Sequence, residues 1–257
     1  MFETISYDVH NHVAWIKMNR PDKLNAFTAA MNHEVAKAVK QATKDEEVRC
    51  LVITGEGRAF CSGQDLSSVD EGTDYGDVLR DNYGPMVRAI DACEKPIIAA
   101  LNGVTAGAGL SLALACDFRL AKEDVKLIQA FIHVGLIPDA GNMYYLPKLI
   151  GHAKALELAV LGEKVSAAEA KELGLLTKVV SADEFDEEVN AFAARLAAMP
   201  TKAIGLIKRS LKAGWNEDFD TYLEREAQGQ RIAGMTEDHR EGVGAFMEKR
   251  KPQFTGK

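Results

Sequence analysis

Residues 95–109 have the sequence "KPIIAALNGVTAGAG", in which an apolar run of strand length leads into a glycine-rich turn. The apolar segment "LSLALAC" follows at 110–116. A buried strand, a tight turn and an apolar helix in this order are typical of a crossover unit in an α/β fold. The turn matches neither GxGxxG nor GK[ST], so it is not a dinucleotide-binding or P-loop motif. A simple structural turn, a phosphate-binding turn and an oxyanion hole of backbone N–H groups remain open.

The alternation of strands and helices continues on the N-terminal side of this stretch. Strand-like runs lie at 13–18 and 50–54, and a helix with an apolar stripe is predicted over 28–43 between them. A further helical segment ends near residue 92. Buried strands separated by amphipathic helices predict an α/β core.

Beyond residue 150 the sequence becomes helical. Ser166 with Glu169, and Ser181 with Glu184, have the spacing of capping boxes that begin two helices. "LLTKVV" at 175–180 predicts a strand between these helices. We expect this part to complete a core that spans residues 1–199.

Three further helices are predicted after Pro200, over 201–213, 217–233 and 236–249. Their apolar residues exceed what an isolated appendage would need, and such helices often cover a neighbouring subunit. The sequence therefore predicts a second region, 200–257, that is helical and mediates oligomerisation.

The charge balance excludes several partners. Lys and Arg number 31 against 38 Asp and Glu, a net charge of -7, so no general positive field attracts nucleic acid or an anionic membrane. The N-terminus has no signal-peptide pattern, and no apolar run reaches membrane-spanning length. The four cysteines are widely spaced without a CxxC pair, which fits a reducing cytoplasm, and the six histidines lack the spacing of metal ligands.

Two further segments are candidates for chemistry. "RAFCSGQDL" at 58–66 places a second glycine turn after a buried strand, so each turn could present one N–H group. "GLIPDAGN" at 135–142 holds a single carboxylate, Asp139, after an apolar run. Apolar surroundings raise the pKa of a carboxyl group and suit it to acid–base work, but the commoner role of an Asp in this place is to cap a helix, here one predicted over 140–150.

Several motifs together resemble the enoyl-CoA hydratase/isomerase (crotonase) family. The motifs are "NRPDKLNAF" (19–27), "RAFCSGQDL", "KPIIAALNGVTAGAG", "ACDFRLA" (115–121), "GLIPDAG" and "AAEAKELGLLTKVV" (167–180). The resemblance implies a superhelix of ββα turns followed by a C-terminal helical region that forms a homotrimer or a dimer of trimers. It also implies an acyl-CoA thioester as substrate, so that coenzyme A belongs to the substrate and no separate cofactor is needed.

The family pattern assigns roles to residues of this chain. The thioester oxygen would accept hydrogen bonds from the backbone N–H groups of Gln64 and Ala108, and each such donor stabilises developing charge by about 3 kcal/mol. The implied contacts with CoA and the acyl group are Lys23, Leu24, Ala26, Ser62, Asp65, Leu66, Phe131, Met143, Phe254 and Lys257. Of these, Phe254 and Lys257 would reach the CoA of a neighbouring subunit.

The resemblance to the family also indicates which reaction to expect. Ser111 and Phe131 occupy the positions of the two glutamates of the family's hydratases, and neither is a carboxylate. Asp139 occupies the position of the single acid of an isomerase branch, so the resemblance favours an isomerase that shifts a double bond, or converts a ring epoxide to an oxepin, through an enolate. The sequence departs from that branch at 142–145, which leaves the acyl group open.

Other functions remain as alternatives. Within the enzyme class they are enoyl-CoA hydration, thioester hydrolysis and aryl-CoA dehalogenation with Asp139 as nucleophile. Outside it, the chain would be an inactive RNA-binding or scaffold relative, against which the net charge of -7 and the two glycine turns argue.

Overall fold

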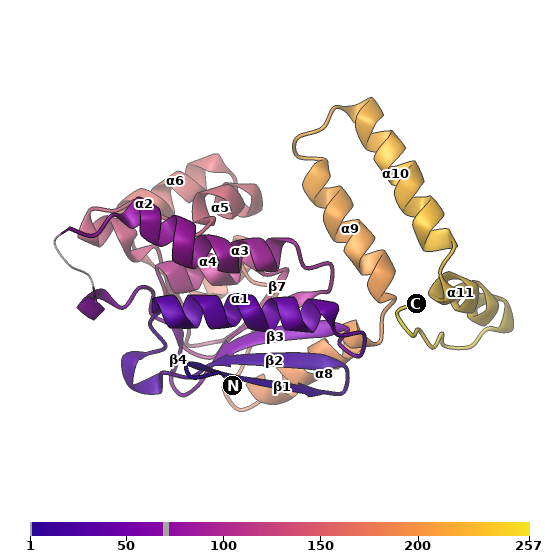
Figure 1. The fold of residues 1–257 in the computed structure, drawn as a ribbon, viewed down its shortest axis with the longest axis horizontal. Coiled ribbons are helices and arrows are strands. Elements are labelled where there is room, and N and C mark those ends of the chain that lie inside the picture. Colours follow the sequence, from indigo (N-terminus) through magenta and orange to yellow (C-terminus); the bar gives the residue numbers. More distant parts are fainter. Residues whose placement is uncertain (1, 69–71) are drawn as a thin grey trace.

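The computed structural model describes residues 2–68 and 72–257, which form two β-sheets with helices around them (Figure 1). The larger sheet has the order β1-β2-β3-β5-β7-β10, and the smaller has the order β4-β6-β8-β9. The strands are β1 (Ile5–His10), β2 (Val13–Met18), β3 (Cys50–Gly55), β4 (Ala59–Cys61), β5 (Ile97–Leu101), β6 (Val104–Ala106), β7 (Phe118–Lys122), β8 (Lys126–Ile128), β9 (Lys164–Ser166) and β10 (Lys178–Val180).

Helices fill the remaining length of the chain. The α-helices are α1 (Ala29–Lys44), α2 (Tyr75–Val78), α3 (Gly84–Asp91), α4 (Ala108–Ala115), α5 (Asn142–Ile150), α6 (His152–Leu161), α7 (Ala167–Glu172), α8 (Phe185–Ala197), α9 (Thr201–Ala213), α10 (Phe219–Gly234) and α11 (Glu237–Glu248). Shorter helical turns are η1 (Pro21–Lys23), η2 (Leu66–Ser68), η3 (Leu79–Tyr83) and η4 (Ala130–Val134).

Consecutive strand pairs build the superhelix that the sequence predicted. In the pairs β3–β4, β5–β6 and β7–β8, the first strand joins the larger sheet and the second joins the smaller one. The first strands pair in parallel with one another, and so do the second strands. Each turn of the chain therefore adds one strand to each sheet and then crosses back through helices.

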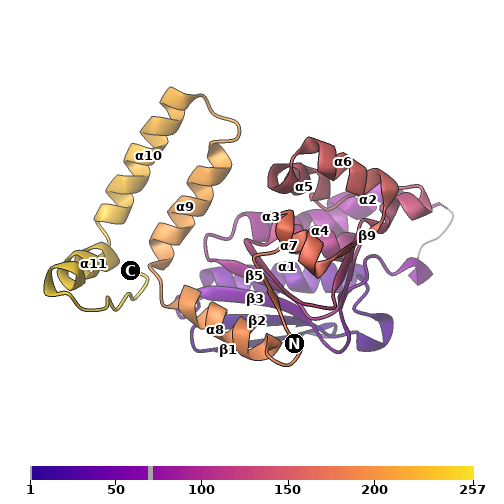
Figure 2. The same ribbon diagram turned by 180° about the vertical axis from the view of Figure 1, so that it is seen from behind.

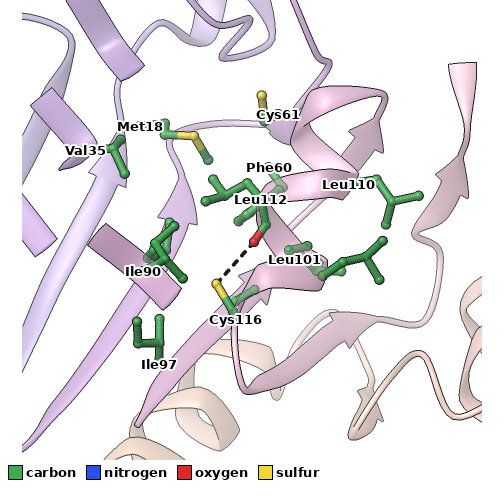
Figure 3. Close-up of a cluster of buried hydrophobic side chains, with 14 of the residues drawn as sticks. Met18, Val35, Phe60, Cys61, Ile90, Ile97, Leu101, Leu110, Leu112 and Cys116 are labelled. Carbon is green, nitrogen blue, oxygen red and sulfur yellow. Dashed lines mark hydrogen bonds between the residues drawn. The ribbon is translucent and has the colours of Figure 1, made fainter. Parts of the chain in front are cut away.

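The central strands of the larger sheet are buried on both faces, which explains their continuous apolar sequences. In β3, Leu51 and Ile53 belong to one core and Cys50 and Val52 to another. This alternation follows from the two-residue period of a strand. The first core includes residues of α1, α3 and α4, as the close-up in Figure 3 illustrates, whereas the second lies against α8 on the opposite face (Figure 2).

The helix boundaries confirm one capping prediction and correct another. The Ser166 hydroxyl caps α7 by accepting a hydrogen bond from the Glu169 N–H at 3.2 Å. The Ser181–Glu184 capping box is wrong, because α8 begins only at Phe185 and its N-cap residue, Glu184, makes no side-chain cap. The Ser181 hydroxyl instead donates to the Glu184 carboxylate at 2.7 Å, within a turn that precedes the helix.

The helices α9, α10 and α11 stand beside the α/β body rather than within it (Figures 1 and 2). No residue of α10 is buried in the single chain. Large apolar side chains remain exposed on these helices and the turns beside them, including Ile207, Leu211, Phe219, Met235, Phe246 and Met247.

No helix in the described residues has both the length and the apolar content needed to cross a bilayer. The division at residues 199 and 200 remains a prediction.

The buried Arg119 of β7 provides a test of how this fold is held together. Its guanidinium donates to the backbone carbonyls of Leu175 at 2.5 Å and Cys116 at 2.6 Å. Replacing Arg119 with Met leaves these buried acceptors unpaired, so we expect a loss of about 3 kcal/mol in the free energy of unfolding, measured with urea. Arg195→Met, on the exposed side of α8, is the control. Equal stabilities of the two variants would show that the Arg119 contacts contribute little.

Candidate active site

Two glycine turns, at residues 62–66 and 106–109, lie in contact at the ends of β4 and β6. A Cβ atom built on Gly109 would lie 2.3 Å from the Cys61 carbonyl oxygen. A Cβ atom on Gly63 would lie 3.2 Å from the Ala106 oxygen and 3.6 Å from the Ala108 nitrogen, at a φ of +103°. Only glycine allows the first approach and readily adopts the second conformation. The glycines therefore bring the two turns together.

The backbone around Gln64 leaves its own N–H group unused. The Phe27 N–H donates to the Gly63 carbonyl at 2.7 Å, and the Asp65 N–H donates to the Phe27 carbonyl at 3.0 Å. This parallel bridge engages the residues on both sides of Gln64. Within the described residues, the Gln64 N–H has no hydrogen-bond acceptor.

The Ala108 N–H is free for a different reason. Ala108 is the first residue of α4, and the first N–H groups of a helix have no acceptor within it. The preceding Gly107 has φ 51° and ψ -127°, a conformation that suits glycine. No other part of the described chain accepts a bond from this N–H. The turns thus carry the two unpaired donors that an oxyanion hole requires.

Asp139 is a partly buried carboxylate whose Oδ1 atom has no hydrogen-bond partner among the described residues. Burial raises the pKa of this carboxyl group to about 6, and its own backbone N–H opposes the rise. The interpretation of Asp139 as an N-cap is wrong, because α5 begins at Asn142 and its N-cap, Gly141, makes no side-chain cap. The Asp139 side chain is therefore unused by the helix that follows it.

The backbone after Asp139 is strained. Ala140, which is buried, has a φ of 51°, and Gly141 has a φ of 82°. A left-handed conformation costs a residue other than glycine about 1 kcal/mol. Such strain is often found at functional sites, where it fixes a side chain in a direction that a relaxed turn would not give.

Tyr83 links the acid to the first glycine turn. The buried Tyr83 hydroxyl donates a hydrogen bond to the side-chain oxygen of Gln64. Burial raises the pKa of this phenol, and the negative charge of Asp139 raises it further. The amide of Asn32, whose Oδ1 is buried without a partner in the described chain, also interacts with the phenol. Neither Tyr83 nor Asn32 was predicted from the sequence.

The predicted residues at 23–26 lie beside the first turn. Lys23 is exposed at the end of η1, and Leu24 has a left-handed φ of 49°. The Leu24 carbonyl accepts a bond from the Ser62 N–H at 3.1 Å, which joins this loop to the glycine turn. Ala26 is buried and its carbonyl accepts from Arg20 at 2.6 Å. Their contacts with CoA remain predictions.

Asp65 performs a structural task in the single chain. Its carboxylate accepts from the Ser67 hydroxyl at 2.6 Å and from the Arg20 guanidinium at 2.9 Å. These two bonds hold the pKa of Asp65 at about 2. The pair joins the loop at residues 20–26 to the first glycine turn, so a contribution of Asp65 to binding would be indirect.

The remaining predicted residues fall in two places. Phe131 is buried in η4, whereas Leu66 and Met143 are about half exposed, at 54% and 46%. The carbonyls of Phe254 and Lys257 bind Arg49 and the Asp238 N–H, so the tail lies beside α11 and the start of α9 (Figure 1). This position is remote from α5, and a contact with a neighbouring subunit's CoA remains a prediction.

Comparison with known proteins identifies the class of this arrangement. The model of the enoyl-CoA hydratase/isomerase family matches residues 8–257. The crystal structure of an enoyl-CoA hydratase from Bacillus anthracis superposes with a TM-score of 0.92 at 34% identity, covering 99% of this chain and 100% of that one. The fold is therefore the crotonase fold, as the sequence predicted. The chain belongs to the enoyl-CoA hydratase/isomerase family.

Two relatives are equally similar in sequence but carry different names. The 1,2-epoxyphenylacetyl-CoA isomerase of Escherichia coli strain K12 is 42% identical over 262 residues and covers all of both chains. A protein of Rhodobacter capsulatus named "Probable enoyl-CoA hydratase" is also 42% identical, over 257 residues, with 100% of this chain and 99% of its own covered. The chain is thus similar to enzymes that act on acyl-CoA thioesters, and its particular reaction rests on the site.

The contact between the turns predicts the effect of a single methyl group. Gly109→Ala places a Cβ 2.3 Å from the Cys61 oxygen and must push the Ala108 N–H away from its present position. We expect kcat/KM for an acyl-CoA substrate to fall at least about 100-fold, the effect of losing one oxyanion donor. Gly229→Ala, in α10 with nothing within 4 Å of the added Cβ, is the matched control. Unchanged activity of Gly109→Ala would contradict this geometry.

Burial of the Asp139 charge predicts a pH-dependent change in stability. The folded pKa, about 6, exceeds the ordinary 3.8, so the stabilisation from protonated Asp139 is complete below pH 4 and is lost as the pH rises through 6. Asp139→Asn should therefore raise the free energy of unfolding at pH 7.5, by on the order of 2 kcal/mol, and change it little at pH 3.8. Urea titrations at both pH values measure this. A free energy of unfolding at pH 7.5 that the substitution lowers or leaves unchanged would contradict the burial of the Asp139 charge.

Proposed function

We propose that the protein is an acyl-CoA isomerase that moves a double bond along the acyl group, with Asp139 as its acid–base residue. One observation carries the proposal: within the part of the chain that the structure describes, Asp139 has a raised pKa and a buried oxygen without a partner, and the two glycine turns present two unpaired N–H groups. The charge of Asp139 raises the pKa of Tyr83, and the Tyr83 hydroxyl donates a hydrogen bond to Gln64, which supports placing Asp139 near the first glycine turn.

The proposed reaction needs one carboxylate and no water. Asp139 removes a proton from the carbon next to the thioester, and the C–H electron pair moves to give an enolate. The N–H groups of Gln64 and Ala108 stabilise the charge on the thioester oxygen. Asp139 then returns the proton to the far end of the conjugated system while the electrons restore the carbonyl. The base is regenerated, so one group can serve both steps.

Hydration is disfavoured by the two positions at which the sequence lacks carboxylates. Ser111 is fully buried, and its hydroxyl accepts a hydrogen bond from the Asn142 amide and donates one to the Gly107 carbonyl. Phe131 is a buried apolar side chain that cannot activate water. Rearrangement of an aryl-CoA ring epoxide to an oxepin is the second candidate for the isomerisation, and the similarity to a 1,2-epoxyphenylacetyl-CoA isomerase supports it.

The proposal predicts a selective loss of turnover in Asp139→Asn. This variant keeps the size of the side chain and removes the base, so isomerisation should fall at least about 100-fold while binding of acyl-CoA persists. A screen of 2-enoyl, 3-enoyl and aryl-CoA esters by mass spectrometry identifies the reaction, because isomerisation leaves the mass unchanged and hydration adds water. For the wild type, log kcat/KM should rise with a slope of one up to pH 6 and then level off. Near wild-type turnover by Asp139→Asn would exclude Asp139 as the base.

We propose further that the chain is cytoplasmic and assembles as a homotrimer or a dimer of trimers. The four cysteines, which are free and buried, support the first point. The exposed apolar side chains of α9–α11 support the second. Phe246→Glu places a charge on a side chain that is 81% exposed in the single chain, and we expect it to shift sedimentation toward smaller species. Ala191→Glu, on the exposed side of α8, is the control. A monomeric wild type would contradict the proposal.

A further inference from the structure

Three buried polar side chains form a network between the acid and the second glycine turn. Ser111 of α4, Gln129 before η4 and Asn142 of α5 are exposed by 0%, 2% and 0%. The Gln129 amide nitrogen donates to the Asn142 side-chain oxygen at 3.1 Å. The Asn142 amide nitrogen donates to the Ser111 hydroxyl and to the Gln129 side-chain oxygen, both at 3.1 Å. Every side chain of the network is thus paired.

The direction of these bonds leaves the Ser111 proton available. Because Asn142 donates to the Ser111 oxygen, the hydroxyl can donate onward, and it does so to the Gly107 carbonyl at 3.3 Å. The Ser111 N–H donates to the same carbonyl at 3.1 Å. The Gly107 carbonyl and the Ala108 N–H belong to one planar peptide group. Fixing the carbonyl therefore fixes the direction of the N–H, and hydrogen bonding to it strengthens the N–H as a donor.

The other end of the network reaches Asp139. The Asn142 N–H donates to the Asp139 backbone carbonyl at 2.9 Å, across the strained Ala140 and Gly141. The backbone of Asn142 therefore holds the turn that contains Asp139. Its side chain acts on the peptide group of Ala108 through Ser111. Helices α4 and α5 are thus joined by side chains that each lie three residues after a functional group, Ser111 after Ala108 and Asn142 after Asp139.

We infer that Ser111 and Asn142 are positioning residues that set the Ala108 N–H toward the thioester oxygen and hold the Asp139 turn in register with it. The inference rests on the thioester site of the proposed function, and it is independent of whether the reaction is isomerisation or hydration. From the sequence, Ser111 stood out only because it replaces a glutamate of the family's hydratases. The inference gives Ser111 a role in the oxyanion hole.

The carbonyl stretching frequency of a bound thioester tests this directly. The probe is hexanoyl-CoA labelled with 13C at the thioester carbonyl, which has no double bond to move. Wild-type protein should lower the frequency, since two N–H groups polarise the carbonyl. Ser111→Ala should give a smaller downshift, and with a turned-over substrate a fall in kcat of about tenfold with KM nearly unchanged. Asn142→Ala should reduce the downshift as well.

Matched variants separate positioning from general loss of structure. Ser166→Ala removes the same hydroxyl from the N-cap of α7 and should leave the frequency at its wild-type value despite a comparable loss of stability. A wild-type downshift that Ser111→Ala leaves intact would overturn the inference while sparing the proposed function. No downshift in the wild type would overturn both.

Discussion

The close approach of two backbone turns is the constraint on which the rest of the site depends. Gly109 lies so near the Cys61 carbonyl that a Cβ would come within 2.3 Å of its oxygen. Each turn follows a strand of the smaller sheet, β4 or β6, and these strands pair in parallel. The ββα superhelix therefore delivers two peptide N–H groups to one place, where they can serve a single oxygen atom.

Electrostatics make this arrangement useful for proton transfer. Two unpaired N–H groups favour negative charge on a bound oxygen, whereas burial disfavours it on Asp139 and raises the pKa to about 6. A proton that moves from an acyl carbon to Asp139 therefore transfers charge from a site that tolerates it poorly to one built to accept it. The neutral phenol of Tyr83 and the neutral amides of Gln129 and Asn142 add polarity without a competing charge.

The sequence predicted those features that depend on local patterns. The strand at 13–18 and the helix at 201–213 have their predicted limits because apolar periodicity defines both. The residues next to Asp139 alone did not separate a base from a helix cap, since the lack of a partner for its oxygen among the described residues depends on the tertiary structure. Gln129 and Tyr83 were missed because their partners, at residues 142 and 64, are distant in sequence. The lone polar Ser111 within "LSLALA" was the available signal for the network.

Transfer of an isotope within the substrate tests the single-acid account most directly. A 3-enoyl-CoA carrying deuterium at C2 would be converted in ordinary water, and the 2-enoyl product would be examined by NMR and mass spectrometry. If Asp139 removes and returns the same proton, deuterium should appear at C4 of the product, diluted only by exchange during the lifetime of the enolate. Product whose C4 carries only solvent hydrogen, even at the earliest times, together with a mass increased by water in part of the product, would contradict the account.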